Sequence, residues 1–246
     1  MRLRRAPWWI AAAVLAAALL IASMKWSGAA PARSGETRLF TTLPILWSES
    51  ADIGGLVRGE GATHWARDTL ATQGRITPLD SLGAIAGDAP LLMAQPRPLS
   101  PEENVALDRW VRHGGRVLLF ADPMLTAPSS YPLGDRRRPQ DVVLISPLLQ
   151  HWGVRLEFDD RQTFGERQVA ALGAVLPVNL PGRLVTIPAV DSDCSVLAQG
   201  LVVDCRIGAG RVLVIADAAL FESAGSTPVQ ARQAALLQLF GELARD

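Results

Sequence analysis

A strand–helix–strand unit over residues 90–121 most strongly limits the folds that this chain can adopt. The apolar run at 90–94 is typical of a short buried strand. The sequence Ser-Pro-Glu-Glu at 100–103 supplies an N-cap, a proline for the first helical position and acids for the first turn, and Gly114-Gly115 ends the helix. A second apolar strand follows at 116–121. This order predicts a parallel crossover, and hence an α/β fold with a mostly parallel sheet and flanking helices.

The other predicted elements are consistent with one such domain. Three apolar runs within 196–216 are separated by Gln199-Gly200 and by residues 208–210, which predicts late antiparallel hairpins. Apolar periodicity, capping residues and glycine turns predict further strands at 38–47 and 154–158, and helices at 62–72, 146–152 and 226–243.

The N-terminal segment predicts one transmembrane helix. Residues 6–24 carry no charge, and at about 1.5 Å per residue they reach roughly 28 Å, close to the thickness of a bilayer core. Tryptophans bracket the segment and arginines precede it, so we expect a cytoplasmic N-terminus and a signal anchor. The alternative is a cleaved signal peptide, because small residues at 28–30 could accept a peptidase. The predicted division is 1–27 as basic N-terminus and anchor, 28–36 as linker, and 37–246 as an exported α/β domain.

The distribution of charge argues against nucleic-acid binding. The chain has 24 basic and 24 acidic residues, and four of the bases flank the apolar segment, so the remaining domain is mildly acidic. Such a domain has no basic footprint for DNA or RNA. The composition is otherwise that of a globular protein, with 49% hydrophobic and 20% charged residues.

The two cysteines predict a disulfide. If Gln199-Gly200 forms a two-residue hairpin turn, Ala198 faces Leu201 and counting outward places Cys194 opposite Cys205. Opposite residues of antiparallel strands are close enough for a disulfide, and export permits oxidation. The alternative is a pair of buried free thiols.

Three segments together resemble one family. They are LSPEENVALDRWVRHGGRVLLFADPM at 99–124, SPLLQHWGVRLEFDD at 146–160 and DCRIGAGRVLVIADAALFES at 204–223. Their sequence and order are similar to the GldG-like auxiliary components of uncharacterised ABC transport systems. The resemblance implies a class I glutamine amidotransferase-like, flavodoxin-like fold that lacks the catalytic cysteine. It also implies a non-enzymatic role beside a transporter.

The resemblance implies that the related enzymes place their nucleophilic cysteine on the turn after the strand that follows Gly114-Gly115. The residues at this turn are consistent with a protein that is not an enzyme. Residues 121–124 read Ala-Asp-Pro-Met, without Cys or Ser, and no Gly-x-Ser-x-Gly or Gly-x-Cys-x-Gly motif occurs. Asp122 could be a nucleophile in principle, but no neighbouring residue in the sequence would activate it. The three histidines lack metal-ligand spacing, so we predict no metal and no cofactor.

Ligands of open parallel sheets bind outside the carboxyl ends of the strands. A ligand site, if the domain has one, should therefore use the residues at these ends, although the same residues could be ordinary loop caps. The candidates are Trp47, Ser48, Glu49, Gln95, Asp122 and Asp217.

Two functions from different classes follow. The first is a non-catalytic accessory or binding domain, anchored in the cell inner membrane with its domain on the periplasmic side and associated with ABC transporter permease subunits. The second is an exported hydrolase or amidase that uses carboxylates such as Glu49 and Asp122.

Overall fold

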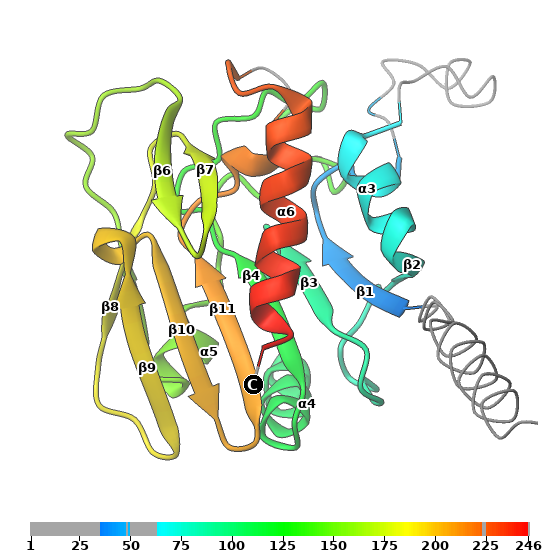
Figure 1. Ribbon diagram of the computed structural model, residues 1–246, viewed down its shortest axis with the longest axis vertical. Coiled ribbons are helices and arrows are strands. Elements are labelled where there is room, and N and C mark those ends of the chain that lie inside the picture. The colour runs from blue at the N-terminus through cyan, green and yellow to red at the C-terminus, as the bar shows by residue number, and fades with distance from the viewer. Residues whose placement is uncertain (1–34, 48, 50–62, 223–224, 246) are drawn as a thin grey trace, which may run out of the picture. The chain divides into compact units, whose positions relative to one another are not determined.

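Parallel strands form the middle of the fold, as the crossover at 90–121 predicts (Figure 1). The computed structural model describes residues 35–47, 49, 63–222 and 225–245. The predicted transmembrane helix lies outside these residues. Within the described residues, no helix is long and apolar enough to cross a bilayer.

The main sheet has seven strands in the order β2-β1-β3-β4-β11-β10-β9. All neighbours from β2 to β11 pair in parallel, whereas β10 is antiparallel to both β11 and β9. The strands of this sheet are β1 Gly35–Thr41, β2 Gly74–Pro78, β3 Leu91–Ala94, β4 Arg116–Phe120, β9 Ser192–Leu197, β10 Val202–Ile207 and β11 Gly210–Ile215.

Two further antiparallel pairs and four α-helices complete the described part of the chain. The pairs are β5 Val154–Glu157 with β8 Arg183–Thr186, and β6 Arg167–Ala171 with β7 Ala174–Val178. The helices are α3 Trp65–Gln73, α4 Pro101–Arg112, α5 Ser146–His151 and α6 Val229–Leu243, with short 3-10 turns η1 Ala198–Gly200 and η2 Ala219–Phe221.

The side chains of alternate residues in the central strands pack into two separate hydrophobic cores. Leu92 and Leu118 point into one core with α3, α6 and the β6–β7 hairpin, whereas Met93 and Leu119 point into the other with α4 and α5. Figure 1 shows α6 across one face of the sheet and α4 and α5 behind it. A strand buried on both faces is a continuous apolar run, which is why β3 and β4 are easy to recognise in the sequence.

The first strand differs from its predicted range of 38–47. It starts at Gly35 and ends at Thr41, because the Thr41 hydroxyl accepts from the N–H of Leu43, two residues later (2.9 Å), and Pro44 has no N–H for a ladder. Thr41 and Thr42 also donate their hydroxyls to the carbonyls of Ala94 and Gln95 (2.6 and 2.5 Å). The chain therefore leaves the sheet as an irregular loop.

The last helix begins three residues later than predicted. Ser226 and Thr227 were expected to start it, but both side chains donate to the Glu166 carboxylate (2.9 and 2.7 Å), and the helix begins at Val229. Arg232 of this helix is buried and pairs with the same carboxylate. A buried arginine requires such a partner, so Glu166 connects the loop before β6 to the first turn of α6.

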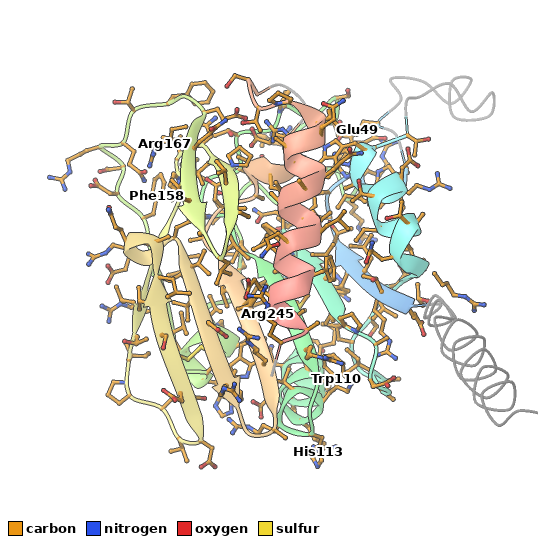
Figure 2. The ribbon with its side chains drawn as sticks, viewed as in Figure 1. Glu49, Trp110, His113, Phe158, Arg167 and Arg245 are labelled. Atoms are coloured by element: carbon orange, nitrogen blue, oxygen red, sulfur yellow. A yellow bond between two sulfur atoms is a disulfide. The ribbon has the colours of Figure 1, made fainter. Side chains whose placement is uncertain are left out.

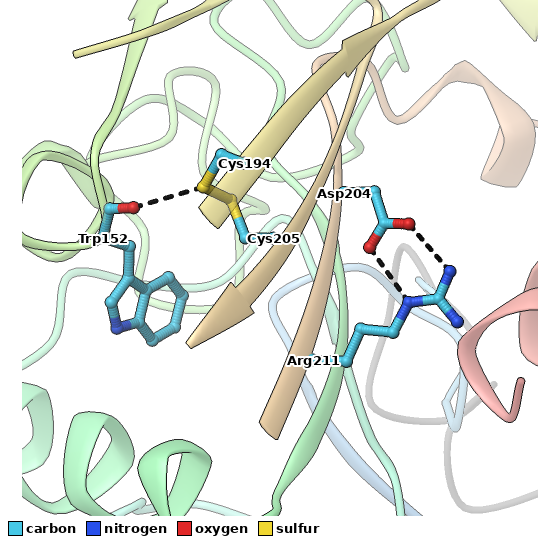
Figure 3. Close-up of a disulfide and its surroundings, with 5 residues drawn as sticks. All are labelled: Trp152, Cys194, Asp204, Cys205 and Arg211. Atoms are coloured by element: carbon cyan, nitrogen blue, oxygen red, sulfur yellow. Dashed lines mark hydrogen bonds and ion pairs between the residues drawn. A yellow bond between two sulfur atoms is a disulfide. The ribbon is translucent and has the colours of Figure 1, made fainter. Parts of the chain in front are cut away.

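The late hairpins have the predicted register. Cys205 lies opposite Cys194, and the two sulfurs are joined in a disulfide with their Cα atoms 4.1 Å apart (Figure 3). The connection uses residues 198–201, in which Ala198, Gln199 and Gly200 all have positive φ and the Leu201 N–H donates to the Ala198 carbonyl (3.1 Å). The covalent bond therefore joins the outermost strand β9 to β10.

Replacing both cysteines by alanine should loosen β9 more than the centre of the sheet. A bond that closes so short a loop contributes on the order of 2–3 kcal/mol through the unfolded chain. We expect faster amide exchange in β9 of the Cys194→Ala/Cys205→Ala variant, with β3 as the internal reference, measured by hydrogen–deuterium exchange. Equal exchange in variant and wild type would contradict a structural role for the disulfide.

Candidate functional site

The predicted ligand residues gather where the parallel strands end. Gln95 follows β3 directly, and Asp122 and Asp217 each lie two residues beyond their strands, β4 and β11. The registers Ala94↔Phe120 and Phe120↔Ile215 align the three strand ends, so these residues share one edge of the sheet. Loops on both sides cover them, and all three are buried.

The Gln95 side chain connects two loops. Its Oε1 accepts from the Asp122 N–H (2.9 Å), and its Nε2 donates to the carbonyls of Asp122 (3.1 Å) and Gln140 (2.7 Å). The residue has a positive φ of 45° and is fully buried. All these contacts are with backbone groups, so Gln95 holds the loops together and has no free group for a ligand.

Asp122 and Asp217 also accept from backbone N–H groups. The two oxygens of Asp122 accept from Met124 (2.8 Å) and Ala218 (3.0 Å). Those of Asp217 accept from Ala219 (2.6 Å) and Asn179 (2.8 Å). Four loop N–H groups are thereby satisfied inside the protein, which is the capping role that the sequence left open for these acids.

Burial makes these two carboxyls poor acids. It raises the pKa of Asp122 to about 7, against the two N–H bonds that lower it, and the charge of Glu222 adds to the rise. Burial, followed by the charge of Asp122, raises the pKa of Asp217 well above its usual value. The two acids are therefore close enough to repel each other, and each ionises less readily when the other is charged.

Three residues missed by the sequence analysis extend this cluster. Glu222 accepts from the Thr126 hydroxyl (2.6 Å), and the same hydroxyl accepts from the Asn179 side-chain amide (2.9 Å). Glu222 lies just beyond Phe221 on the strand-end segment that also holds Asp217, so its position gave a usable signal. Asn179 and Thr126 gave none, because their contacts with Asp217, Glu222 and each other join residues far apart in the sequence.

The remaining predicted residues lie in the loop after β1. Trp47 is 41% exposed, Glu49 accepts from the Ser129 hydroxyl (3.0 Å) and the Ser130 N–H (2.7 Å), and Ser48 lies outside the described residues. Glu49 therefore orders a neighbouring loop. A small hollow of about 140 Å³ adjoins it, with a mainly apolar lining.

His64 closes one side of this hollow. Its Nδ1 accepts from the Ala66 N–H (3.2 Å) as the N-cap of α3, so its Nε2 carries the proton and donates to the Phe221 carbonyl (2.8 Å). Burial lowers the pKa of His64, which favours this neutral form. His64 is thus a structural link between α3 and the segment after β11.

A larger hollow of about 610 Å³ runs along the free edge of β6. The hairpin turn of β6 and β7 has positive φ at Leu172 and Gly173, as a two-residue type I′ turn requires, so Ala171 and Ala174 form its first hydrogen-bonded pair. Pairs alternate along an antiparallel ladder, so the backbone groups of Gln168 and Ala170 point away from β7 and into the hollow. These groups have no hydrogen-bond partner among the described residues.

We call this hollow along β6 the β6 groove. Its lining is polar and carries an excess of positive charge. Arg167 and Arg183 make no ion pair with any described carboxylate, whereas Asp159 is paired with Arg161 (2.9 Å). Figure 2 shows Arg167 near the end of the molecule where Glu49 also lies. The groove is lined by Asp159, Gln162, Arg167, Gln168, Val169, Ala170, Pro181, Gly182, Arg183, Ala198, Gln199 and Leu201.

The two regions differ in what they can do chemically. The acids of the strand ends have their oxygens committed to backbone N–H groups and are closed off from solvent. Within the described residues, no group of three His, Cys, Asp or Glu side chains could hold a metal ion. The β6 groove, in contrast, has solvent-exposed backbone donors and acceptors, which can bind an extended chain.

The raised pKa of Asp122 predicts a pH dependence of stability. In the unfolded chain this carboxyl ionises near 3.8, whereas in the fold its pKa is about 7. The folded state therefore binds more protons between these values, and the free energy of unfolding falls as the pH rises through this window. In Asp122→Asn this contribution is absent. The difference in the free energy of unfolding, wild type minus variant, should therefore fall by roughly 1 kcal/mol for each pH unit within this window.

Urea unfolding of both proteins from about pH 5 to about pH 8 would measure this difference. Asp160→Asn, which removes an exposed carboxylate, is the matched control and should follow the wild type. Parallel pH profiles for wild type and Asp122→Asn would show that Asp122 ionises like an exposed acid.

Comparison with solved structures shows likeness of fold alone. The mmIFT52 N-terminal domain is 13% identical with a TM-score of 0.51, over 74% of this chain and 89% of that one. A putative ThuA-like protein from Bacteroides uniformis ATCC 8492 is 9% identical with a TM-score of 0.46, over 88% and 94%. The exo-beta-1,4-mannosidase Op5Man5 from Opitutaceae bacterium strain TAV5 is 13% identical with a TM-score of 0.42 over 85% of this chain, which spans only 33% of that enzyme.

No curated protein sequence matches the chain. A family comparison does find a match, and it includes α4, β4 and the Asp122 turn. Residues 66–163 match the model of the family described as ABC-type uncharacterized transport system, which confirms the resemblance to its auxiliary components that the sequence segments indicate.

Proposed function

We propose that this protein is a membrane-anchored, non-catalytic accessory domain of an ABC-type transport system, and that it holds an extended segment of a partner protein along β6. The proposal includes a class I glutamine amidotransferase-like fold, an anchor at 1–27 and a domain on the periplasmic side of the inner membrane. Permease subunits are the expected partners. The family match supports the association with a transport system.

The observation that carries the proposal is the free edge of β6. Gln168 and Ala170 present two N–H and two C=O groups in a row along a hollow of about 610 Å³. This is the arrangement to which an extended peptide adds as a further strand. Arg167 and Arg183 on its walls favour a segment that carries an acidic side chain.

The alternative, a hydrolase using Glu49 and Asp122, has less support. The Asp122 side chain is fully buried and both of its oxygens accept from backbone N–H groups. Glu49 accepts from Ser129 and Ser130. A nucleophile or base of a hydrolase must reach the substrate, and these carboxylates are used within the fold.

Proline at Ala170 tests the groove directly. It removes an outward N–H without breaking a β6–β7 hydrogen bond, and Pro177 already occupies the equivalent kind of position opposite Gln168. We expect the variant to fold and to recover partner proteins at least about tenfold less well, since one lost backbone bond and a steric block together exceed roughly 1.4 kcal/mol. Co-purification of the full-length protein from its native membranes in mild detergent, with quantitative identification of bound proteins, is the measurement.

Val175→Pro is the matched control. Val175 lies opposite Ala170 on β7 and is half exposed, so the same substitution alters the same rung away from the groove. Recovery of no transporter component by the wild type would argue against the proposed association, and equal loss in both variants would argue against the groove.

The anchor has its own test. A reporter that is active only in the periplasm, fused after Asp246, should be active, and extraction should need detergent because the attachment is hydrophobic. Release by salt alone, or a mature N-terminus near Ala30, would show that residues 1–27 do not anchor the protein.

A further inference from the structure

A row of arginines lies at the edge of the main sheet where its parallel strands begin, opposite the carboxyl edge that holds Asp122 and Asp217. Arg116 begins β4, Arg211 lies beside it on β11, and Arg206 lies beside Arg211 on β10. Paired residues of neighbouring strands point to the same face, so the three side chains project together on the α6 side. Arg245, just beyond α6, joins them around a hollow of about 290 Å³.

The fold neutralises only half of these four charges. Arg211 pairs with Asp204 (2.7 Å, Figure 3), and its guanidinium also donates to the Glu242 and Arg245 carbonyls (both 2.6 Å). Arg245 pairs with Glu242 (2.6 Å). The side chains of Arg116 and Arg206 make no hydrogen bond or ion pair with a described residue. Arg206 lies opposite Asp193 on β9 without an ion pair to it, and Arg116 lies beside Arg211, so the row keeps a positive excess.

The hollow lies at the edge where the chain enters the domain. Parallel strands begin at the same edge, and the register Arg38↔Leu91, Leu91↔Val117 and Val117↔Val212 aligns the fourth residue of β1 with the first residue of β3, the second of β4 and the third of β11. Gly35 begins β1 at this edge. Figure 2 shows His113 at this end of the domain and Arg167 toward the other, with Arg245 between them.

The length of the linker limits how far this edge can lie from the proposed anchor. The seven residues 28–34 between the anchor and Gly35 span at most about 25 Å. Three strand spacings from β1 to β11 amount to about 14 Å, so a modest tilt brings the arginines to the membrane surface. A linker of this length therefore allows the basic hollow to reach the lipid.

We propose that the hollow formed by Arg116, Arg206, Arg211 and Arg245 binds the phosphate of an anionic phospholipid headgroup and so docks the domain on the membrane. This inference rests on the proposed anchor. Guanidinium groups are the preferred partners of phosphate oxygens, and a hollow of about 290 Å³ is about ten times the roughly 30 Å³ share of one water. An anionic leaflet carries the opposite charge to the arginines, which adds to the attraction.

The test uses the full-length chain in lipid nanodiscs. Exposed Ala209 at the rim is changed to Cys and labelled with an environment-sensitive dye, and the other two cysteines are in the disulfide. Headgroup-nitroxide lipid should quench the dye in discs containing phosphatidylglycerol, and much less in discs of phosphatidylcholine alone. The Arg116→Gln/Arg206→Gln variant should lower the ratio of docked to free domain about 30-fold, at about fivefold per arginine.

The matched control is Arg67→Gln/Arg136→Gln, which removes two exposed arginines at the carboxyl edge of the sheet and should keep wild-type quenching. Added salt should reduce quenching of the wild type, because the attraction is electrostatic. Equal quenching in the two double variants, or in the two kinds of disc, overturns the proposal. If inorganic phosphate shifts the dye emission in phosphatidylcholine discs and phosphatidylglycerol adds nothing, the hollow takes a soluble anion and lipid docking is also overturned.

Failure of the anchor is recognised separately. Flotation of the full-length chain with phosphatidylcholine vesicles at high salt tests the anchor without the arginines, because hydrophobic insertion survives salt. A chain that floats under these conditions but shows no lipid-dependent quenching retains its anchor and lacks the proposed docking.

Discussion

The parallel pairing of β4 with β11 determines both ends of this domain. The two strands are about ninety residues apart in sequence, and their register places Arg116 beside Arg211 at one end and Phe120 beside Ile215 at the other. Beyond these ends lie the arginine hollow and the buried acids, Asp122 and Asp217. A shift of one residue would turn every side chain of β11 to the opposite face, so apolar burial on both faces fixes the register and thereby both sites.

The carboxyl edge, where α/β proteins usually bind their ligands, is here occupied by the protein itself. Gln95 and the two acids satisfy loop N–H and C=O groups that would otherwise be buried without partners. The arrangement orders long loops at the cost of placing two carboxyls where water cannot solvate them, which appears as their raised pKa values. The polar groups at this edge are therefore used within the fold, and the outer surfaces of the domain keep the groups that are free to bind a partner.

Local sequence signals predicted the parts of the fold that depend on local interactions. The capping residues and Gly114-Gly115 gave α4 within a residue of its bounds, and the glycine turns gave the β9–β10–β11 hairpins and the register of the cysteines. The strand β2 was not predicted, and residues 164–188 gave only weak signals for short strands, without the pairing of β6 with β7, because short strands at the margin of a domain have no distinctive pattern. For the site, position after a strand identified Gln95, Asp122 and Asp217 as neighbours, but whether they face solvent depends on long-range loop packing.

The disulfide has a mechanical consequence for the margin of the sheet. An edge strand that is pulled from one end normally loses its hydrogen bonds to the neighbouring strand one pair at a time, so it resists only a small force. Cys194 lies in the middle of β9, and its bond to Cys205 stops such peeling halfway. Any further tension on β9 passes to β10 and through it to β11 and the buried centre. A sheet margin of this kind transmits strain to the centre of the sheet without fraying.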